Sequence, residues 1–140
     1  MEMHHGAILR LRLKNIYMNL INVQKFHEVL LAEKDNTGIA FINVCTPVEY
    51  SSSRIEGVEN MPLDELGERF QGLKDKSIVY IHCASGVRSK LAVDKLTELG
   101  IQADLVIVEG GLMSWINAGF KTIPGTNKVS LLRKLFGKKE

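Results

Sequence analysis

The fold is decided by residues 77–88, which read Ser77-Ile78-Val79-Tyr80-Ile81-His82-Cys83-Ala84-Ser85-Gly86-Val87-Arg88. The run 77–82 is apolar and β-prone, which predicts a buried strand. A loop of small residues follows it. A helix is then expected from about Val87 to Leu99, and Gly100 is its stop signal. A buried strand that leads through a short loop into a helix is typical of a parallel α/β sheet.

The same alternation extends over most of the chain. Further buried strands are expected at 39–44 and 103–108, and Asn60-Met61-Pro62 reads as an extended segment. Asn22 is a candidate N-cap for a helix that begins at Val23. Other helical segments are expected at 47–50, 63–70 and 113–118. The apolar faces of the two longer helices are predicted to point inward, with Phe26, Val29 and Leu30 on the first and Leu91, Ala92, Leu96 and Leu99 on the second.

Length and composition limit the class of protein. A chain of 140 residues, 45% hydrophobic and 24% charged, corresponds to one globular domain. No stretch without a charge exceeds 13 residues, the length of 36–48, whereas a membrane-spanning helix needs about 18 or more. Two cysteines are too few for a disulfide framework or a thiolate zinc site, so a reducing, cytoplasmic location is expected. The net charge of +2 and the sparse aromatic residues do not describe a nucleic-acid-binding surface.

The two ends of the chain differ from the middle. We expect a domain over 20–124, preceded by a basic and apolar extension over 1–19 and followed by a basic amphipathic tail over 125–140. Leu9, Leu11 and Leu13 alternate with basic residues, as in an edge strand, and a transit peptide is the alternative. For residues 127–140, a helix packed on the domain is favoured over peripheral docking on an anionic membrane or an acidic partner.

Cys83 is the candidate reactive residue because it stands at the carboxyl end of a buried strand, where parallel sheets bind ligands. The backbone amides of 84–88 can converge above its sulfur and attract an anion. Gly86 permits the turn that such a loop needs. The positive electrostatic field of these amides also favours the thiolate form of Cys83. The planar cation of Arg88 is suited to bind an oxyanion. His82 is expected to point away from Cys83, since neighbours on a strand face opposite sides.

Four motifs in order resemble the rhodanese family. The segment 83–88, a cysteine followed by four residues and an arginine, is similar to that family's active-site loop. The segment 41–50 (Phe-Ile-Asn-Val-Cys-Thr-Pro-Val-Glu-Tyr) is similar to its first strand and Glu-Tyr turn, and 55–63 to its Asn-Ile-Pro segment. The segment 108–120, with Gly110-Gly111 and Trp115, is similar to its closing motif, in which these residues are expected to be structural.

The resemblance implies a central, mostly parallel five-stranded sheet with helices on both faces. It also implies a sulfurtransferase in which Cys83 carries a persulfide and Ala84, Ser85, Gly86, Val87 and Arg88 bind the substrate. The implied donor is a small anion such as thiosulfate, and the acceptor is cyanide, a thiol or a protein. No metal or organic cofactor is implied. Phosphatases use a loop one residue longer, so four residues between cysteine and arginine favour sulfur chemistry.

The chain departs from the family pattern at three places. Asn43 and Cys45 stand where the family usually has aspartate and arginine, and Ser53-Arg54 stands where it usually has Gly-His. These changes leave open a weakly catalytic interaction module or a sulfur carrier as alternatives to an enzyme. Cys45 is either a small buried hydrophobic residue or, if it lies near Cys83, a resolving thiol.

Overall fold

The computed structural model of the chain describes residues 19–124. Its centre is a five-stranded sheet in the order β1-β5-β4-β2-β3, and every pair of neighbouring strands is parallel. The strands are β1 (Asn19–Ile21), β2 (Ile39–Asn43), β3 (Glu59–Asn60), β4 (Ile78–His82) and β5 (Asp104–Val108). The predicted α/β architecture is confirmed.

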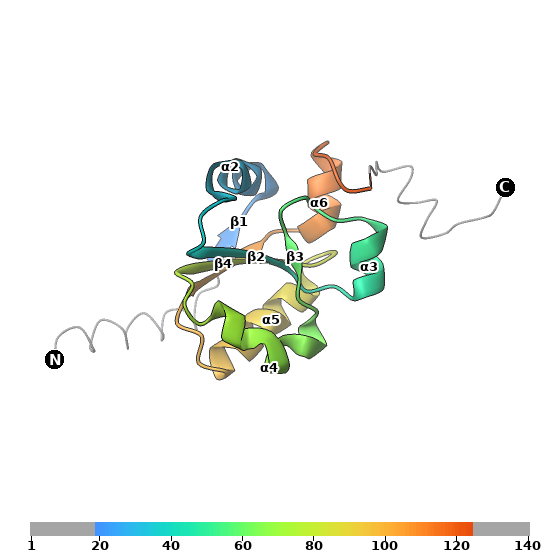
Figure 1. The fold of residues 1–140 in the computed structure, drawn as a ribbon. Helices are drawn as coiled ribbons and strands as arrows, with labels where there is room; N and C mark the ends of the chain where they lie inside the picture. Colours follow the sequence, from blue (N-terminus) through green and yellow to red (C-terminus); the bar gives the residue numbers. More distant parts are fainter. Residues whose placement is uncertain (1–18, 125–140) are drawn as a thin grey trace.

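Helices cover both faces of the sheet (Figure 1). One face carries α2 (Val23–Glu33) and α6 (Gly111–Asn117), and the other carries α4 (Leu66–Arg69) and α5 (Val87–Glu98). The short α3 (Pro47–Ser52) follows the carboxyl end of β2. Parallel strands need such crossover connections, and these leave little of the sheet exposed to water.

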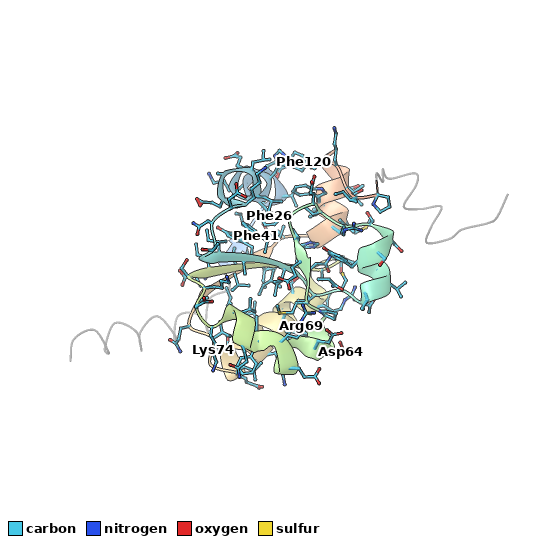
Figure 2. All side chains as sticks on the ribbon, viewed as in Figure 1. Phe26, Phe41, Asp64, Arg69, Lys74 and Phe120 are labelled. Atoms are coloured by element: carbon cyan, nitrogen blue, oxygen red, sulfur yellow. The ribbon has the colours of Figure 1, made fainter. Side chains whose placement is uncertain are left out.

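Each face of the sheet has its own apolar core, because alternate residues of a strand point to opposite sides. In β4, Val79 and Ile81 pack with Ala92 and Leu96 of α5, whereas Tyr80 packs on the other side. That other core is rich in aromatic rings, and Phe26 of α2 lies near Phe41 of β2 in Figure 2. The side chains at the carboxyl ends of β2 and β4 are therefore held from both sides.

Most expected elements are found within one or two residues of their predicted ends. Asn22 caps α2 by accepting a hydrogen bond from the amide of Lys25, and Trp115 is buried as expected. The predicted helix over 63–70 is instead three short pieces, the 3-10 helix η1 (Leu63–Glu65), α4, and a second 3-10 helix, η2 (Phe70–Leu73). The prediction that Leu91 points inward is wrong, since its side chain is half exposed.

The edge strand β1 begins at Asn19 and pairs with β5. This strand was not expected from the sequence, because three residues give too short a pattern to show alternation. The strand expected around Leu9 to Leu13 and the tail over 125–140 lie outside the described residues. Within 19–124, no helix has the length and apolar character required to cross a bilayer.

The burial of Phe26 predicts a large loss of stability on truncation. Its ring is 1% exposed and contacts the rings of Phe41, Tyr80 and Trp115. We expect Phe26→Ala to lower the free energy of unfolding in urea by about 3–5 kcal/mol, because a cavity replaces these contacts. Leu31→Ala, on the exposed side of the same helix, should change it by less than about 0.5 kcal/mol. Equal effects of the two substitutions would contradict this packing.

Candidate active site

Cys83 stands at the first position after β4, and a three-residue loop separates it from α5. The connecting loop, Ala84 to Gly86, is short, and Gly86 has a φ of +113°, a conformation that residues with a side chain rarely adopt. This turn directs the amino-terminal end of α5 toward the sulfur. The loop expected from the sequence is therefore present and is built as a strand–turn–helix unit.

A cup of hydrogen-bond donors surrounds the Cys83 sulfur. The amide of Gly86 donates to Sγ at 3.0 Å, and the amides of Ser85 and Ser89 also favour the thiolate. Burial of this side chain, 1% exposed, opposes ionisation. The hydrogen bonds outweigh that burial, and the Ser89 hydroxyl makes the largest contribution among them. The pKa of Cys83 is consequently lowered, which is the condition for a nucleophilic thiolate near neutral pH.

Ser89 is a residue of this site for which no role was expected from the sequence. Its hydroxyl is fully buried, and within the described residues no atom meets the geometry of a hydrogen bond with it. It is close enough to the Cys83 sulfur to lower the thiol pKa. A buried hydroxyl is costly without a partner, and its effect on the Cys83 pKa identifies the thiolate as the group it stabilises. The signal available in the sequence was a serine one turn into the helix that follows the cysteine.

The start of α6 holds the carbonyl groups of the loop. The amide of Leu112 donates to the Cys83 carbonyl at 2.9 Å, and that of Met113 donates to the Ala84 carbonyl at 3.0 Å. Gly111 makes this approach possible: a Cβ there would lie 2.2 Å from the Cys83 carbonyl oxygen. The Gly110-Gly111 turn therefore has a structural role, as expected: it brings the start of α6 against the carbonyl groups of Cys83 and Ala84.

Arg88 lies at the mouth of the site and is paired with Glu49. Its two terminal nitrogens bind the two carboxylate oxygens of Glu49 at 2.6 and 3.0 Å, from α5 to α3. Chiefly because of this hydrogen bonding to Arg88, the pKa of Glu49 is lowered to about 2. Glu49 lies within the motif 41–50, and no role for its side chain was expected from the sequence. The guanidinium keeps part of its donor capacity, since it has five N–H groups.

Cys45 lies in the same apolar cluster as Cys83 and is also buried. Its pKa is raised to about 11, chiefly by burial, and the charges of Glu49 and Cys83 add to this. Arg88 and the amide of Ala84 act in the opposite direction. The structure therefore brings Cys45 to the wall of the site, where it is held as a neutral thiol.

His82 takes no part in the thiolate cup. It follows Ile81 in the strand and so faces the opposite side of the sheet from Cys83, as predicted. Its ring is buried, Nδ1 lies 3.1 Å from the backbone carbonyl of Cys83, and burial lowers the pKa of the imidazole to about 4. His82 is thus neutral at physiological pH. Within the described residues, no group of three or more histidine, cysteine or carboxylate side chains could hold a metal ion.

The chain is similar to known proteins over most of the described residues. A model of the rhodanese-like domain matches residues 26–118. Uncharacterized protein slr1261 of Synechocystis is 24% identical over 115 residues, 81% of this chain and 64% of that protein, so the match spans less than two thirds of its length. The protein of Bacillus subtilis named "Putative sulfur carrier protein YrkF" is 34% identical over 62 residues, 44% of this chain and 34% of that one.

Two solved structures show the same architecture. A rhodanese-related protein from Thermoplasma volcanium is 33% identical, with a TM-score of 0.62, covering 76% of this chain and 97% of its own. The thiosulfate sulfurtransferase of Pseudomonas aeruginosa has a TM-score of 0.69 at 21% identity, covering 86% of this chain and 23% of its own. The second likeness concerns the fold alone.

The position of Ser89 predicts how the Cys83 thiol responds to substitution. We expect Ser89→Ala to raise the pKa of Cys83 and to slow its alkylation by iodoacetamide at pH 7 severalfold, because the thiolate loses its strongest donor. The measurement is the alkylation rate as a function of pH, with Cys83 identified by peptide mapping. Ser53→Ala, which removes a buried, unpartnered hydroxyl at the end of α3, is the matched control and should leave the profile unchanged.

The Glu49–Arg88 pair predicts an acid-sensitive contribution to stability. The folded-state pKa of Glu49, about 2, lies below its ordinary value of 4.5. Its contribution is therefore complete above pH 4.5 and is lost as the pH falls toward 2. The side chain is partly exposed, so we expect only about 1 kcal/mol. When the free energy of unfolding is measured between pH 6 and 2, it should fall less steeply with decreasing pH for Glu49→Gln than for the wild type. The exposed control Glu68→Gln should follow the wild type.

Proposed function

The chain belongs to the rhodanese-like domain family, and we propose that it is a sulfurtransferase that carries sulfane sulfur as a persulfide on Cys83. The observation that carries this proposal is the cup of donors around one ionisable sulfur. Family membership supports sulfur chemistry in general. The donor, the acceptor and the identity of the site residues are parts of the proposal.

The first half-reaction begins with the Cys83 thiolate. It attacks the outer sulfur of thiosulfate or a similar donor, the sulfur–sulfur bond of the donor breaks, and sulfite leaves with the electron pair. Covalent storage divides one transfer into two easier steps. The amides of Ser85, Gly86 and Ser89 are placed to stabilise negative charge on the terminal sulfur of the persulfide, as an oxyanion hole does for oxygen. Ala84 and Val87 contribute the rest of the loop backbone.

Arg88 is assigned to the sulfonate end of the donor. Two of its N–H groups are committed to Glu49, which fixes the guanidinium at the mouth of the site. The remaining donors are free to meet an incoming anion. Because the carboxylate of Glu49 offsets the positive charge, we expect the attraction for the anion to be local and directional rather than long-range.

The second half-reaction transfers the outer sulfur to a thiophilic acceptor, for which cyanide or a thiol would serve. One surface feature favours a thiol carried by a protein. Next to the loop residues Gly86 and Val87, a groove of about 540 Å³ is lined by the exposed apolar side chains of Leu20 and Leu91. An acceptor segment that lies in this groove would be held against the loop that follows Cys83. A carrier function with slow release to small acceptors is the second candidate.

The proposal predicts a specific mass change. Thiosulfate should add one sulfur atom to Cys83 of the reduced protein and release about one equivalent of sulfite, because the cup stabilises the persulfide. Mass spectrometry of the intact chain detects the adduct, and cyanide should remove it as thiocyanate. Arg88→Lys should form the same adduct at least tenfold more slowly at limiting thiosulfate, because a lysine cannot keep the two-pronged contact with Glu49.

Cys83→Ser is the control and should form no adduct. An adduct that forms fully but is discharged slowly by cyanide would assign the carrier function. A wild-type protein that releases no sulfite and gains no sulfur would exclude sulfurtransfer from thiosulfate.

A further inference from the structure

A second thiol, that of Cys45, lies in the same buried cluster as Cys83 and has no part in the chemistry described above. The strands β2 and β4 are adjacent and parallel, with Asn43 opposite His82. The ladder continues one residue further, since the amide of Val44 donates to the His82 carbonyl at 2.9 Å. In this register Val44 is the residue opposite Cys83, and Cys45 is the next residue along the chain. Because neighbouring strands lie about 4.8 Å apart, the two cysteines stand on adjacent segments at the same end of the sheet.

A turn at Asn43 directs Cys45 to the face that holds Cys83. The side chains of Ile42 and Val44 already lie on that face, so simple alternation would place Cys45 on the opposite one. Instead, the side-chain oxygen of Asn43 accepts the amide of Cys45 at 2.8 Å, and the strand ends there. Both Val44 and Cys45 consequently pack in the cluster that contains Cys83. Asn43 is therefore a positioning residue for Cys45.

The surroundings of Cys45 belong to the active site. The groups that act on the pKa of its thiol are the amide of Ala84 in the loop and the charges of Cys83, Arg88 and Glu49. These groups come from the loop after β4, from α5 and from α3. Cys45 is thus buried close enough to Cys83 for the charge of one thiol to act on the other, and it stays protonated because burial raises its pKa.

We propose that Cys45 resolves the Cys83 persulfide by attacking the inner sulfur, which forms a Cys45–Cys83 disulfide and releases the outer sulfur as hydrosulfide. The step rests on the proposed function, which supplies the persulfide. Cys45 gives its electron pair to Sγ of Cys83, the sulfur–sulfur bond of the persulfide breaks, and the departing sulfur takes that bond's electrons together with the Cys45 proton. The outer sulfur is reduced, Cys45 is oxidised, and no external oxidant is needed.

Resolution gives the chain a further activity. Without an external acceptor, each molecule converts one sulfane sulfur to sulfide and then stops as a disulfide. A thiol reductant of the cell restores both cysteines by exchange. The buried disulfide also protects Cys83 from oxidation beyond the sulfenic level while no acceptor is present.

The test uses the full chain, reduced and freed of small thiols, mixed with thiosulfate in the absence of cyanide and added thiol. We expect about one equivalent each of sulfite and hydrosulfide per chain. The intact mass should fall by two hydrogen atoms, and peptide mapping without reduction should join Cys45 to Cys83. The rate of hydrosulfide release should not depend on protein concentration, because the attack is intramolecular.

The matched variant is Cys45→Ser, with Cys45→Ala as a second version and thermal unfolding as the check on folding. Both variants should release sulfite as the wild type does but retain the persulfide and release at least tenfold less hydrosulfide. A stable wild-type persulfide with full sulfite release would overturn the inference and leave the proposed function intact. Sulfane sulfur found on Cys45 would also overturn it. Absence of sulfite would overturn the proposed function and this step together.

Discussion

The candidate active site depends on two hydrogen bonds made on the side of the loop Ala84 to Gly86 that faces away from the Cys83 sulfur. A short loop can aim its amides inward only if its carbonyl groups are satisfied elsewhere, since unpaired buried carbonyls are costly. Here the amides of Leu112 and Met113, at the start of α6, bind the carbonyls of Cys83 and Ala84. The absence of a side chain on Gly111 allows the contact. The carbonyl oxygens of Cys83 and Ala84 therefore point toward α6, which leaves the amide N–H groups of the loop to face the Cys83 sulfur.

The sheet order explains how distant segments of sequence meet at this loop. β4 is central, with β5 on one side and β2 on the other. The chain after β5 turns at Gly110 into α6 and supports the loop from behind, whereas the chain after β2 enters α3 and supplies Glu49 at the front. Parallel strands bring all these connections to one edge of the sheet. The site is therefore a consequence of strand order as much as of the motif that contains Cys83.

Much of this could be predicted from the sequence, and the limits have physical causes. The buried strands 39–44, 77–82 and 103–108 were recognisable because continuous β-branched and apolar runs are a strong local signal. The exposure of Leu91 was not predictable, because half-buried positions on a helix depend on where the neighbouring strand ends. The Glu49–Arg88 pair joins residues 39 positions apart, and the contact of Cys45 with the loop depends on a single turn at Asn43. Contacts of this kind join residues that are distant in the chain, so they produce no periodic pattern in the sequence.

The two cysteines show how one site assigns different roles to identical side chains. Both are buried, which alone would raise both pKa values. Around Cys83, several hydrogen-bond donors reverse that effect, whereas around Cys45 one amide and a guanidinium already paired with Glu49 do not. Two adjacent thiolates would also repel each other, so ionisation of Cys83 keeps Cys45 protonated. The number of donors aimed at each sulfur therefore decides which thiol meets an electrophile from solution and which one reacts only with its neighbour.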